Sequence, residues 1–383
     1  MIKTRFILPN INNIFLVLSI IFLPFISFVD FRPPIRPSEI LFGFFLAIYI
    51  LSLLMGLIKY QKSLNIFIGF FILNFIFYLY GLFNVDDQFF DISYQFYGFM
   101  KLSLLCICLL FFYFSLRLFN LKQLVNFWVI GFIIFFTIHF FIYFFEERLL
   151  YKRAGLFFEG NIAGLYYFIS FMIFNIYRKH FSSHKLFVVI FYLALVGIYF
   201  SHSTMAFITL SIYFFLNFKD KFILKNFIFL FIILIINFKF IINKFPFLVT
   251  DAKLYGFSFT NRLKTINESL DIFKDNIFFG SGFSSFGFVR DSYIQSEIKY
   301  NFLASVNNVF FKTLSDVGLI GFLISCIFFW FIIFYDMGKK KFRLFIYILP
   351  ILFYLNAFPT LYVPFIWVSL AIFKLLVKNS DNY

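Results

Sequence analysis

The chain has 383 residues, of which 62% are hydrophobic and only 13% charged, and its formal net charge is +15. A soluble domain of this length needs far more polar surface, so this composition excludes an ordinary soluble protein. A basic balance can indicate nucleic-acid binding, but here the Lys and Arg residues are mostly dispersed over short connections between apolar blocks. That distribution argues against nucleic acid as a partner.

Apolar blocks of about 20 residues recur along the chain, and each is long enough to cross a bilayer as a helix. They predict an all-α, polytopic integral membrane protein with about 12 transmembrane helices. The first block is too long for a cleaved signal peptide, so we expect it to be retained. Asn356, Pro359 and Pro364 interrupt the last two blocks, which could form one broken span. In chain order the predicted spans are 13–29, 39–58, 64–83, 96–116, 124–145, 160–177, 186–200, 203–218, 222–242, 309–335, 342–357 and 360–377.

The chain divides into residues 1–242 with nine spans, a large and relatively polar loop at 243–308, and residues 309–383 with the last three spans and a short tail. Lys and Arg mark alternate connections, whereas the connection that holds Asp86, Asp87 and Asp91 has neither. The positive-inside rule therefore predicts that both termini lie in the cytoplasm and that the large loop lies on the outer side.

The large loop is predicted to contain a helix over residues 261–275, with Thr260 as its N-cap. An approximately helical apolar stripe runs along it, and Gly280-Ser281-Gly282 ends it. A structured loop of this length is uncommon without a function, although a cap that merely covers the bundle is the alternative. The stripe consists of Leu263, Ile266, Leu270, Ile272 and Phe273.

Several cations are predicted on the outer side. Arg153 precedes a span, and its guanidinium suits bidentate contact with phosphate; an anchor at the membrane interface is the alternative. Arg262 and Lys264 start the loop helix, where cations oppose the helix dipole unless an external anion completes the site; the alternative is a solvated face. Arg290 is a further candidate. Lys101 is the one clear cation predicted inside a span, either paired with an acid or binding a headgroup.

Four stretches of the sequence resemble, in order, the O-antigen polymerase/O-antigen ligase superfamily, the Wzy type in particular. They cover about residues 150–325. The stretches read RAGLFFEGNIAG from Arg153, SHSTMAF from Ser201, NRLKTINESLDIFKDNIFFGSGFSSFG from Asn261 and VNNVFFKTLSDVGLIGFL from Val306.

Two departures from the family pattern are informative. The family often shows a Ser-Arg pair where this chain has Ser203-Thr204, so that Arg is missing. In the ligases of the superfamily a catalytic His precedes the Asn of the fourth stretch, whereas here Asn307 precedes Asn308. Asn cannot take up a proton as His can, which favours a polymerase over a ligase.

The resemblance implies an O-antigen, or related surface polysaccharide, polymerase of a Gram-negative inner membrane. Its substrates would be undecaprenyl-diphosphate-linked oligosaccharides on the periplasmic face, and it also suggests a chain-length regulator protein as a partner. The diphosphate leaving group needs cations, for which we predict Arg153 and Arg262, with Lys264 or Arg290 assisting. We expect no metal and no cofactor, because the two arginines can supply the charge.

Glu159 is the first candidate for the general base, with Asp291 and Glu297 as alternatives. The remaining predicted substrate-binding residues are Asn161, Gly280, Gly282, Asn307 and Asn308. Three other functions stay open at this point: a ligase of the same superfamily that transfers glycan to lipid A–core, a lipid-linked oligosaccharide flippase or other transporter, and a non-catalytic membrane assembly factor.

Overall fold

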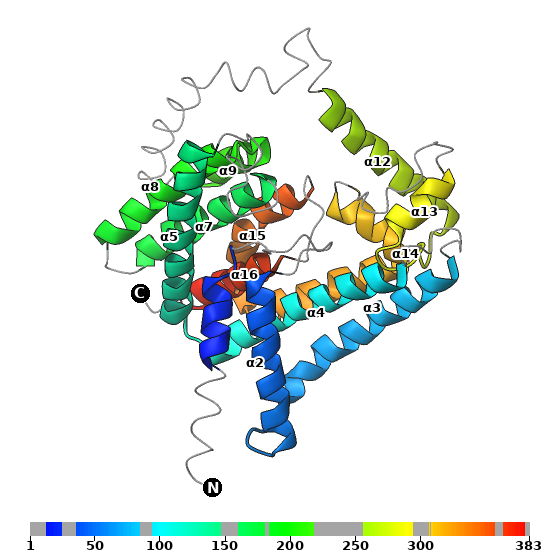
Figure 1. Cartoon of the computed structure of the whole chain (residues 1–383), viewed down its shortest axis with the longest axis horizontal. Helices are drawn as coiled ribbons and strands as arrows, with labels where there is room; N and C mark the ends of the chain where they lie inside the picture. Colours follow the sequence, from blue (N-terminus) through cyan, green and yellow to red (C-terminus); the bar gives the residue numbers. More distant parts are fainter. Residues whose placement is uncertain are drawn as a thin grey trace.

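The computed structural model of the chain describes residues 13–24, 36–84, 94–146, 160–180, 184–217, 256–293, 306, 308–356 and 363–379. Regular structure in these ranges is helical throughout, as predicted. The α-helices are α2 (Pro37–Leu54), α3 (Asn65–Asn84), α4 (Tyr94–Leu118), α5 (Leu121–Phe145), α7 (Gly160–His180), α8 (His184–Ser201), α9 (Thr204–Leu216), α12 (Gly256–Asp275), α13 (Phe286–Tyr293), α14 (Val309–Phe334), α15 (Lys341–Leu355) and α16 (Pro364–Asn379) (Figure 1). A further helix covers residues 13–21, and 3-10 turns lie at Lys62–Leu64 and Gly338–Lys340.

Five helical segments in the described ranges are long and apolar enough to cross a membrane, and each agrees closely with a predicted span. They are Pro37–Leu54, Lys62–Asn84, Tyr94–Leu118, Leu121–Phe145 and Val309–Phe334. Two shorter apolar helices, Leu186–Ser201 and Thr204–Leu216, match the predicted short pair. The chain is therefore an all-α polytopic membrane protein. The predicted span at 222–242 lies outside the described residues, so the total of twelve stays a prediction.

The last two predicted spans form two helices, α15 and α16, which pack against each other. Pro364 is the first residue of α16, a position where its fixed φ suits the helix and its missing N–H costs nothing. Pro350 lies inside α15. Residues 357–362 between the two helices lie outside the described residues, so two separate spans stay a prediction beside the single broken span.

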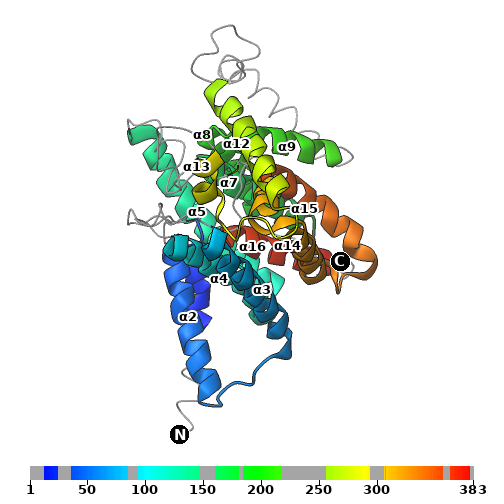
Figure 2. The same cartoon turned by 90° about the vertical axis from the view of Figure 1, so that its right-hand side faces the viewer.

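The interior of the bundle is formed around α7 and α16. Every residue of α7 from Ile162 to Tyr177 is buried, and so is α16 from its first residue to Lys374. The neighbours of these two helices include α4, α5, α8, α9 and α15, and both helices lie inside the bundle in Figures 1 and 2. By contrast, α3 and α5 expose apolar side chains such as Ile76 and Phe141, as expected of helices that face lipid.

Basic connections from distant parts of the chain gather at one end of the bundle. Arg117, at the end of α4, donates a hydrogen bond to Ser63 Oγ before α3 (3.3 Å). Lys378, at the end of α16, lies 3.3 Å from Asp336 after α14, and Lys340 Nζ donates to the Lys378 carbonyl (2.7 Å). The basic residues of these connections thus share one end of the bundle; which side of the membrane that end faces stays a prediction.

The large loop differs from prediction at its start. α12 begins at Gly256, four residues before the predicted cap Thr260, and ends at Asp275 as predicted. A Thr is tolerated inside a helix as well as at its cap, so capping preference alone did not fix the boundary. A second loop helix, α13, was not predicted. Within the predicted stripe, Ile272 is fully buried against Phe286 and Val306, whereas Leu263 is exposed.

Candidate functional site

The centre of the candidate site is a break in α14, where Gly318 has φ 65° and ψ −171°. A break in an apolar helix leaves backbone groups that need partners, because lipid offers none. Residues 276–285, which we call the docked loop, supply them. The four bonds run from Ser281 N to Ser315 O (2.8 Å), from Gly282 N to Asp316 O (2.8 Å), from Leu319 N to Ile277 O (2.8 Å) and from Ile320 N to Phe278 O (3.2 Å).

The two predicted loop glycines allow this close approach of backbone to backbone. Gly280 has φ 68°, and a Cβ there would lie 2.5 Å from Gly318 N. Gly282 has φ 115°, and a Cβ there would lie 2.2 Å from Gly81 Cα on α3. Phe283 N also donates to Phe77 O of α3 (3.2 Å). The structure therefore gives these glycines a packing role; their part in substrate binding stays a prediction.

A buried ion pair lies beside the docked loop. Lys312 and Asp316, one turn apart on α14, contact each other through Nζ and Oδ2, and both side chains are buried. Asp316 Oδ1 also accepts a hydrogen bond from Phe286 N (3.3 Å), the first residue of α13, so the carboxylate lies at the positive end of that helix. Asp316 thereby joins α14 to α13.

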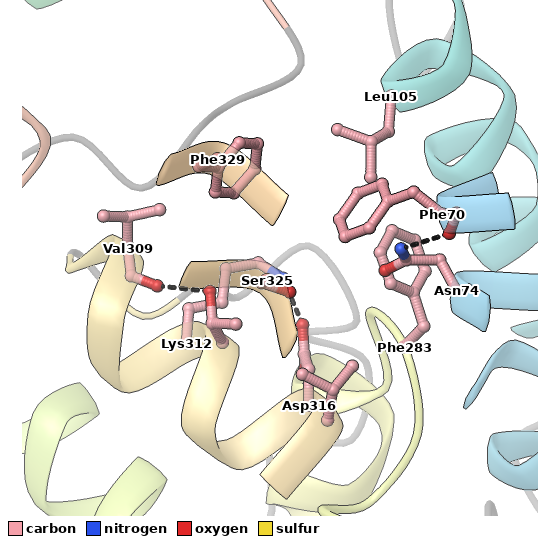
Figure 3. A pocket seen from close by; sticks show the side chains of 11 residues that line it. Phe70, Asn74, Leu105, Phe283, Val309, Lys312, Asp316, Ser325 and Phe329 are labelled. Atoms are coloured by element: carbon pink, nitrogen blue, oxygen red, sulfur yellow. Dashed lines mark hydrogen bonds and ion pairs between the residues drawn. The ribbon is translucent and has the colours of Figure 1, made fainter. Parts of the chain in front are cut away.

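The pair borders a cavity of about 60 Å³, large enough for a few water molecules (Figure 3). Asn74 of α3 lies across this cavity, and its Nδ2 donates to Phe70 O (2.8 Å). Lys101 of α4 interacts electrostatically with both Lys312 and Asp316, and its Nζ lies 4.1 Å from the centre of the Tyr97 ring. Charged groups from α4 and α14 therefore share one region of the bundle.

The prediction that Lys101 is the one cation inside a span is wrong. Lys312 and Lys374 are also buried inside helices, and Arg36 is buried beside α2. Each has a carboxylate partner: Lys312 has Asp316, Lys374 has Asp336 and Arg36 has Glu39.

A cluster of neutral polar groups, which we call the amide cluster, connects α7, α9, α14 and α15. Ser203 Oγ donates to Asn161 Oδ1 (3.0 Å) and lies 2.8 Å from Tyr354 OH, which donates to Asn161 O (2.6 Å). Asn308 caps α14 by accepting from the backbone N–H groups of residues 310 and 311, while its Nδ2 donates to Asn356 Oδ1 (3.0 Å). Asn308 also lies one helical turn before Lys312.

The predicted site residues fall into three groups. Four of them lie outside the described residues: Arg153, Glu159, Glu297 and Asn307. Asp291, on α13, has a described backbone only. Arg262 on α12 and Arg290 on α13 have a described backbone only. Asn161 and Asn308 lie in the amide cluster, and Gly280 and Gly282 in the docked loop.

The predicted role of Arg262 and Lys264 at a helix N-terminus is wrong, because α12 begins at Gly256 and both residues lie farther along it. Lys264 is exposed and lies 4.0 Å from Glu268, as on an ordinary solvated helix face. Sequence reasoning also missed Lys312, Tyr354 and Asn356. The spacing of Lys312 and Asp316, four residues apart inside an apolar block, was the signal available for the ion pair.

These contacts define a polytopic membrane protein in which a helical loop docks into a broken helix beside buried charges. Residues 187–326 match the Wzy_C family model, described as O-antigen ligase. This stretch, 140 of the 383 residues, is consistent with the O-antigen polymerase/ligase superfamily that the four stretches resemble, and members of that superfamily are glycosyl-transferring enzymes. The match covers the second, third and fourth of the resembling stretches, and the first precedes it. No curated protein matches the chain.

Proposed function

We propose that the chain is a polymerase of O-antigen or a related surface polysaccharide in a bacterial inner membrane. The observation that carries this proposal is that the resembling stretches contact one another in pairs, the first with the second and the third with the fourth. Asn161 of the first stretch binds Ser203 of the second, the docked loop of the third completes α14, and Asn308 of the fourth joins Asn356. The end of α15 lies between these contacts, because Tyr354 binds Asn161 and Asn356 binds Asn308, and this arrangement supports the proposal.

The proposed reaction is glycosyl transfer between two polyprenyl-diphosphate-linked glycans. A hydroxyl oxygen of the incoming unit attacks the anomeric carbon of the growing glycan, and the bond from that carbon to the diphosphate breaks. The bonding electrons leave with the polyprenyl diphosphate, and the hydroxyl proton passes to a general base, for which Glu159 is the first candidate. Negative charge develops on the leaving diphosphate, so cations aimed at it lower the barrier.

We assign that charge stabilisation to Arg153 and Arg262, with Lys264 or Arg290 assisting. The described contacts support this assignment through α7, which follows the Arg153 segment in sequence, and through α12, which carries Arg262. Asn161, eight residues after Arg153, is held through both its side chain and its carbonyl. α12, which carries Arg262, is fixed to α14 because Ser269 Oγ donates to Phe311 O (2.8 Å). A helix held in this way can orient the charge that it carries without reorganisation during the reaction.

The sequence around Asn308 favours a polymerase over a ligase. Asn307 stands where the ligases carry a catalytic His, and an amide does not take up a proton at neutral pH. Asn308 itself uses its oxygen to cap α14 and its nitrogen to bind Asn356, so we assign it a positioning role. A ligase remains the alternative in the same superfamily.

The buried charges are the one observation that favours a flippase or other transporter, because such proteins use charges inside the membrane. The described pairs Arg36–Glu39 and Lys312–Asp316 are matched in charge, and Lys101 adds a single cation beside the second pair. Matched pairs offer a moving substrate less net charge than a single cation would. We therefore rank transport below glycosyl transfer.

The test is a deletion strain whose surface glycan is separated by gel electrophoresis after complementation. A polymerase deletion leaves core capped with one repeat, whereas a ligase deletion leaves core bare. Arg153→Ala and Arg262→Ala should each abolish the long-chain ladder, while Arg343→Ala, at the opposite end of the bundle, should keep it. A normal ladder from both site variants would refute the proposed roles. Purified protein that lengthens lipid-linked repeats would exclude the transporter and the assembly factor.

A further inference from the structure

A second cavity, of about 430 Å³, lies at the end of the bundle opposite to the docked loop. Its walls come from the start of α3, the end of α4, the end of α14 and the end of α16. It is therefore separate from the proposed glycosyl-transfer site, and the reaction proposed above makes no use of it.

The mouth of this cavity carries excess positive charge. Arg117, Lys374 and Lys378 line it together with one carboxylate, that of Asp336. Asp336 is shared, because Lys374 Nζ lies 2.6 Å from one of its oxygens and Lys378 Nζ lies 3.3 Å from the other. One negative charge therefore faces three positive charges. A cavity with low-dielectric walls and excess charge of one sign concentrates counter-ions.

The cations differ in how tightly the protein holds them. Lys374 is buried, and it donates to Ile332 O (2.8 Å) as well as pairing with Asp336. Arg117 is exposed, and its guanidinium donates to the neutral Ser63 Oγ (3.3 Å); no carboxylate in the described ranges pairs with it. Lys378 has a side chain that is 55% exposed. Arg117 and Lys378 can therefore turn toward an anion at low cost, whereas Lys374 stays in place.

The walls behind this mouth are apolar. Phe67, Phe112, Phe331 and Leu375 line the cavity along the membrane-spanning helices. Near the mouth, Tyr113 OH donates to Gln61 Oε1 (2.6 Å) and lies 2.9 Å from Ser63 Oγ, which accepts from Arg117. A free phosphate would leave the apolar walls without a partner. A molecule with a phosphate head and a hydrocarbon chain matches both parts of the cavity.

We propose that this cavity binds an anionic phospholipid of the membrane leaflet at the basic end of the bundle. Its phosphate contacts Arg117 and Lys378, and one acyl chain lies against the phenylalanines. The site fastens the basic ends of α4 and α16 to the lipid surface. It requires no glycosyl transfer, so it stands or falls independently of the proposed function.

The test is native mass spectrometry of the full chain, purified in mild detergent and titrated with phosphatidylglycerol or with phosphatidylcholine of the same chains. Wild type should retain phosphatidylglycerol preferentially. Arg117→Gln and Lys378→Gln should each weaken that binding by roughly tenfold, the loss of one charge-assisted contact. Lys339→Gln is the matched control, because Lys339 is exposed at the same end but does not line the cavity.

Three results would overturn the proposal: equal retention of phosphatidylcholine, equal loss of binding in the Lys339 control, and displacement of the lipid by millimolar inorganic phosphate. The last result would assign the cavity to a free phosphate. Both site variants change exposed side chains, and thermal unfolding of each variant verifies that it folds. The readout is lipid binding alone, so a failed glycan ladder would not affect it.

Discussion

Replacement of Gly318 by Ala should release the docked loop from α14. The φ/ψ values of Gly318 fall in a region that only glycine adopts readily, and forcing another residue into it costs about 1–3 kcal/mol. The added Cβ would also lie 2.4 Å from Phe278 O and 2.5 Å from Gly280 N, so the loop must move. Loss of one of the four backbone bonds adds about 1 kcal/mol. The docked state should therefore weaken by about 2–4 kcal/mol.

Hydrogen exchange of the purified protein in detergent measures this change directly. Because about 1.4 kcal/mol is a factor of ten, the amides of Ser281 and Gly282 should lose roughly 30- to 700-fold of their protection. Gly338→Ala is the matched control, because Gly338 also has a positive φ (50°) but a Cβ there would meet nothing within 4 Å. If Gly318→Ala leaves both amides within about threefold of wild type, the loop does not complete α14 as argued.

Three further predictions concern other contacts. Asp316→Asn leaves Lys312 buried without its counter-charge and should lower the free energy of unfolding by about 3–5 kcal/mol, measured by thermal unfolding. Asn308→Ala should lose about 1 kcal/mol of capping, whereas Asn308→Asp keeps the cap and loses only the donor. Burial alone would raise the pKa of Asp336, but the hydrogen bonds and charges of Lys374 and Lys378 outweigh burial and hold that pKa below its usual value. A carboxyl group whose pKa is lowered on folding contributes its full stabilisation at pH values above its pKa in the unfolded chain, and loses it as the pH falls further. The difference in melting temperature between wild type and Asp336→Asn should therefore be constant from pH 5 to 8 and shrink below about pH 4.

Each of these predictions has its own control. Asp316→Leu combined with Lys312→Met should recover much of the stability lost in Asp316→Asn; no recovery would mean that the loop contact, and not the ion pair, dominates. Equal loss in Asn308→Ala and Asn308→Asp would contradict the capping role. A gap for Asp336→Asn that widens on acidification would reverse the sign argued from its lysine partners.

The sequence predicted the helices well because apolar length is a local property. α4, α5 and α14 begin and end within a few residues of the predicted spans, and α12 ends at the predicted residue. The start of α12 was predicted less well, since Thr260 fits a cap and a helix interior almost equally. Asn161 and Asn308 were predicted as site residues, and the structure places both in the amide cluster.

The break at Gly318 could not be predicted from its own neighbourhood. Glycine is common in membrane helices, and the surrounding residues of α14 have the composition of an uninterrupted apolar helix. The break is stable only because a loop about 35 residues earlier supplies the missing hydrogen-bond partners. The same holds for Tyr354, whose hydroxyl meets Asn161 and Ser203 from a distant helix.

By itself the sequence determined that this is an all-α membrane protein, where most of its helices lie and which connections are basic. These properties follow from the transfer of each segment between water and lipid, which depends on that segment's own residues. The tertiary structure alone decided that Asp316 joins α14 to α13, that Gly318 breaks its helix and that Arg117 and Lys378 share one cavity. Those outcomes depend on contacts between segments far apart in the chain, because buried polar groups accept whichever partners packing brings within reach.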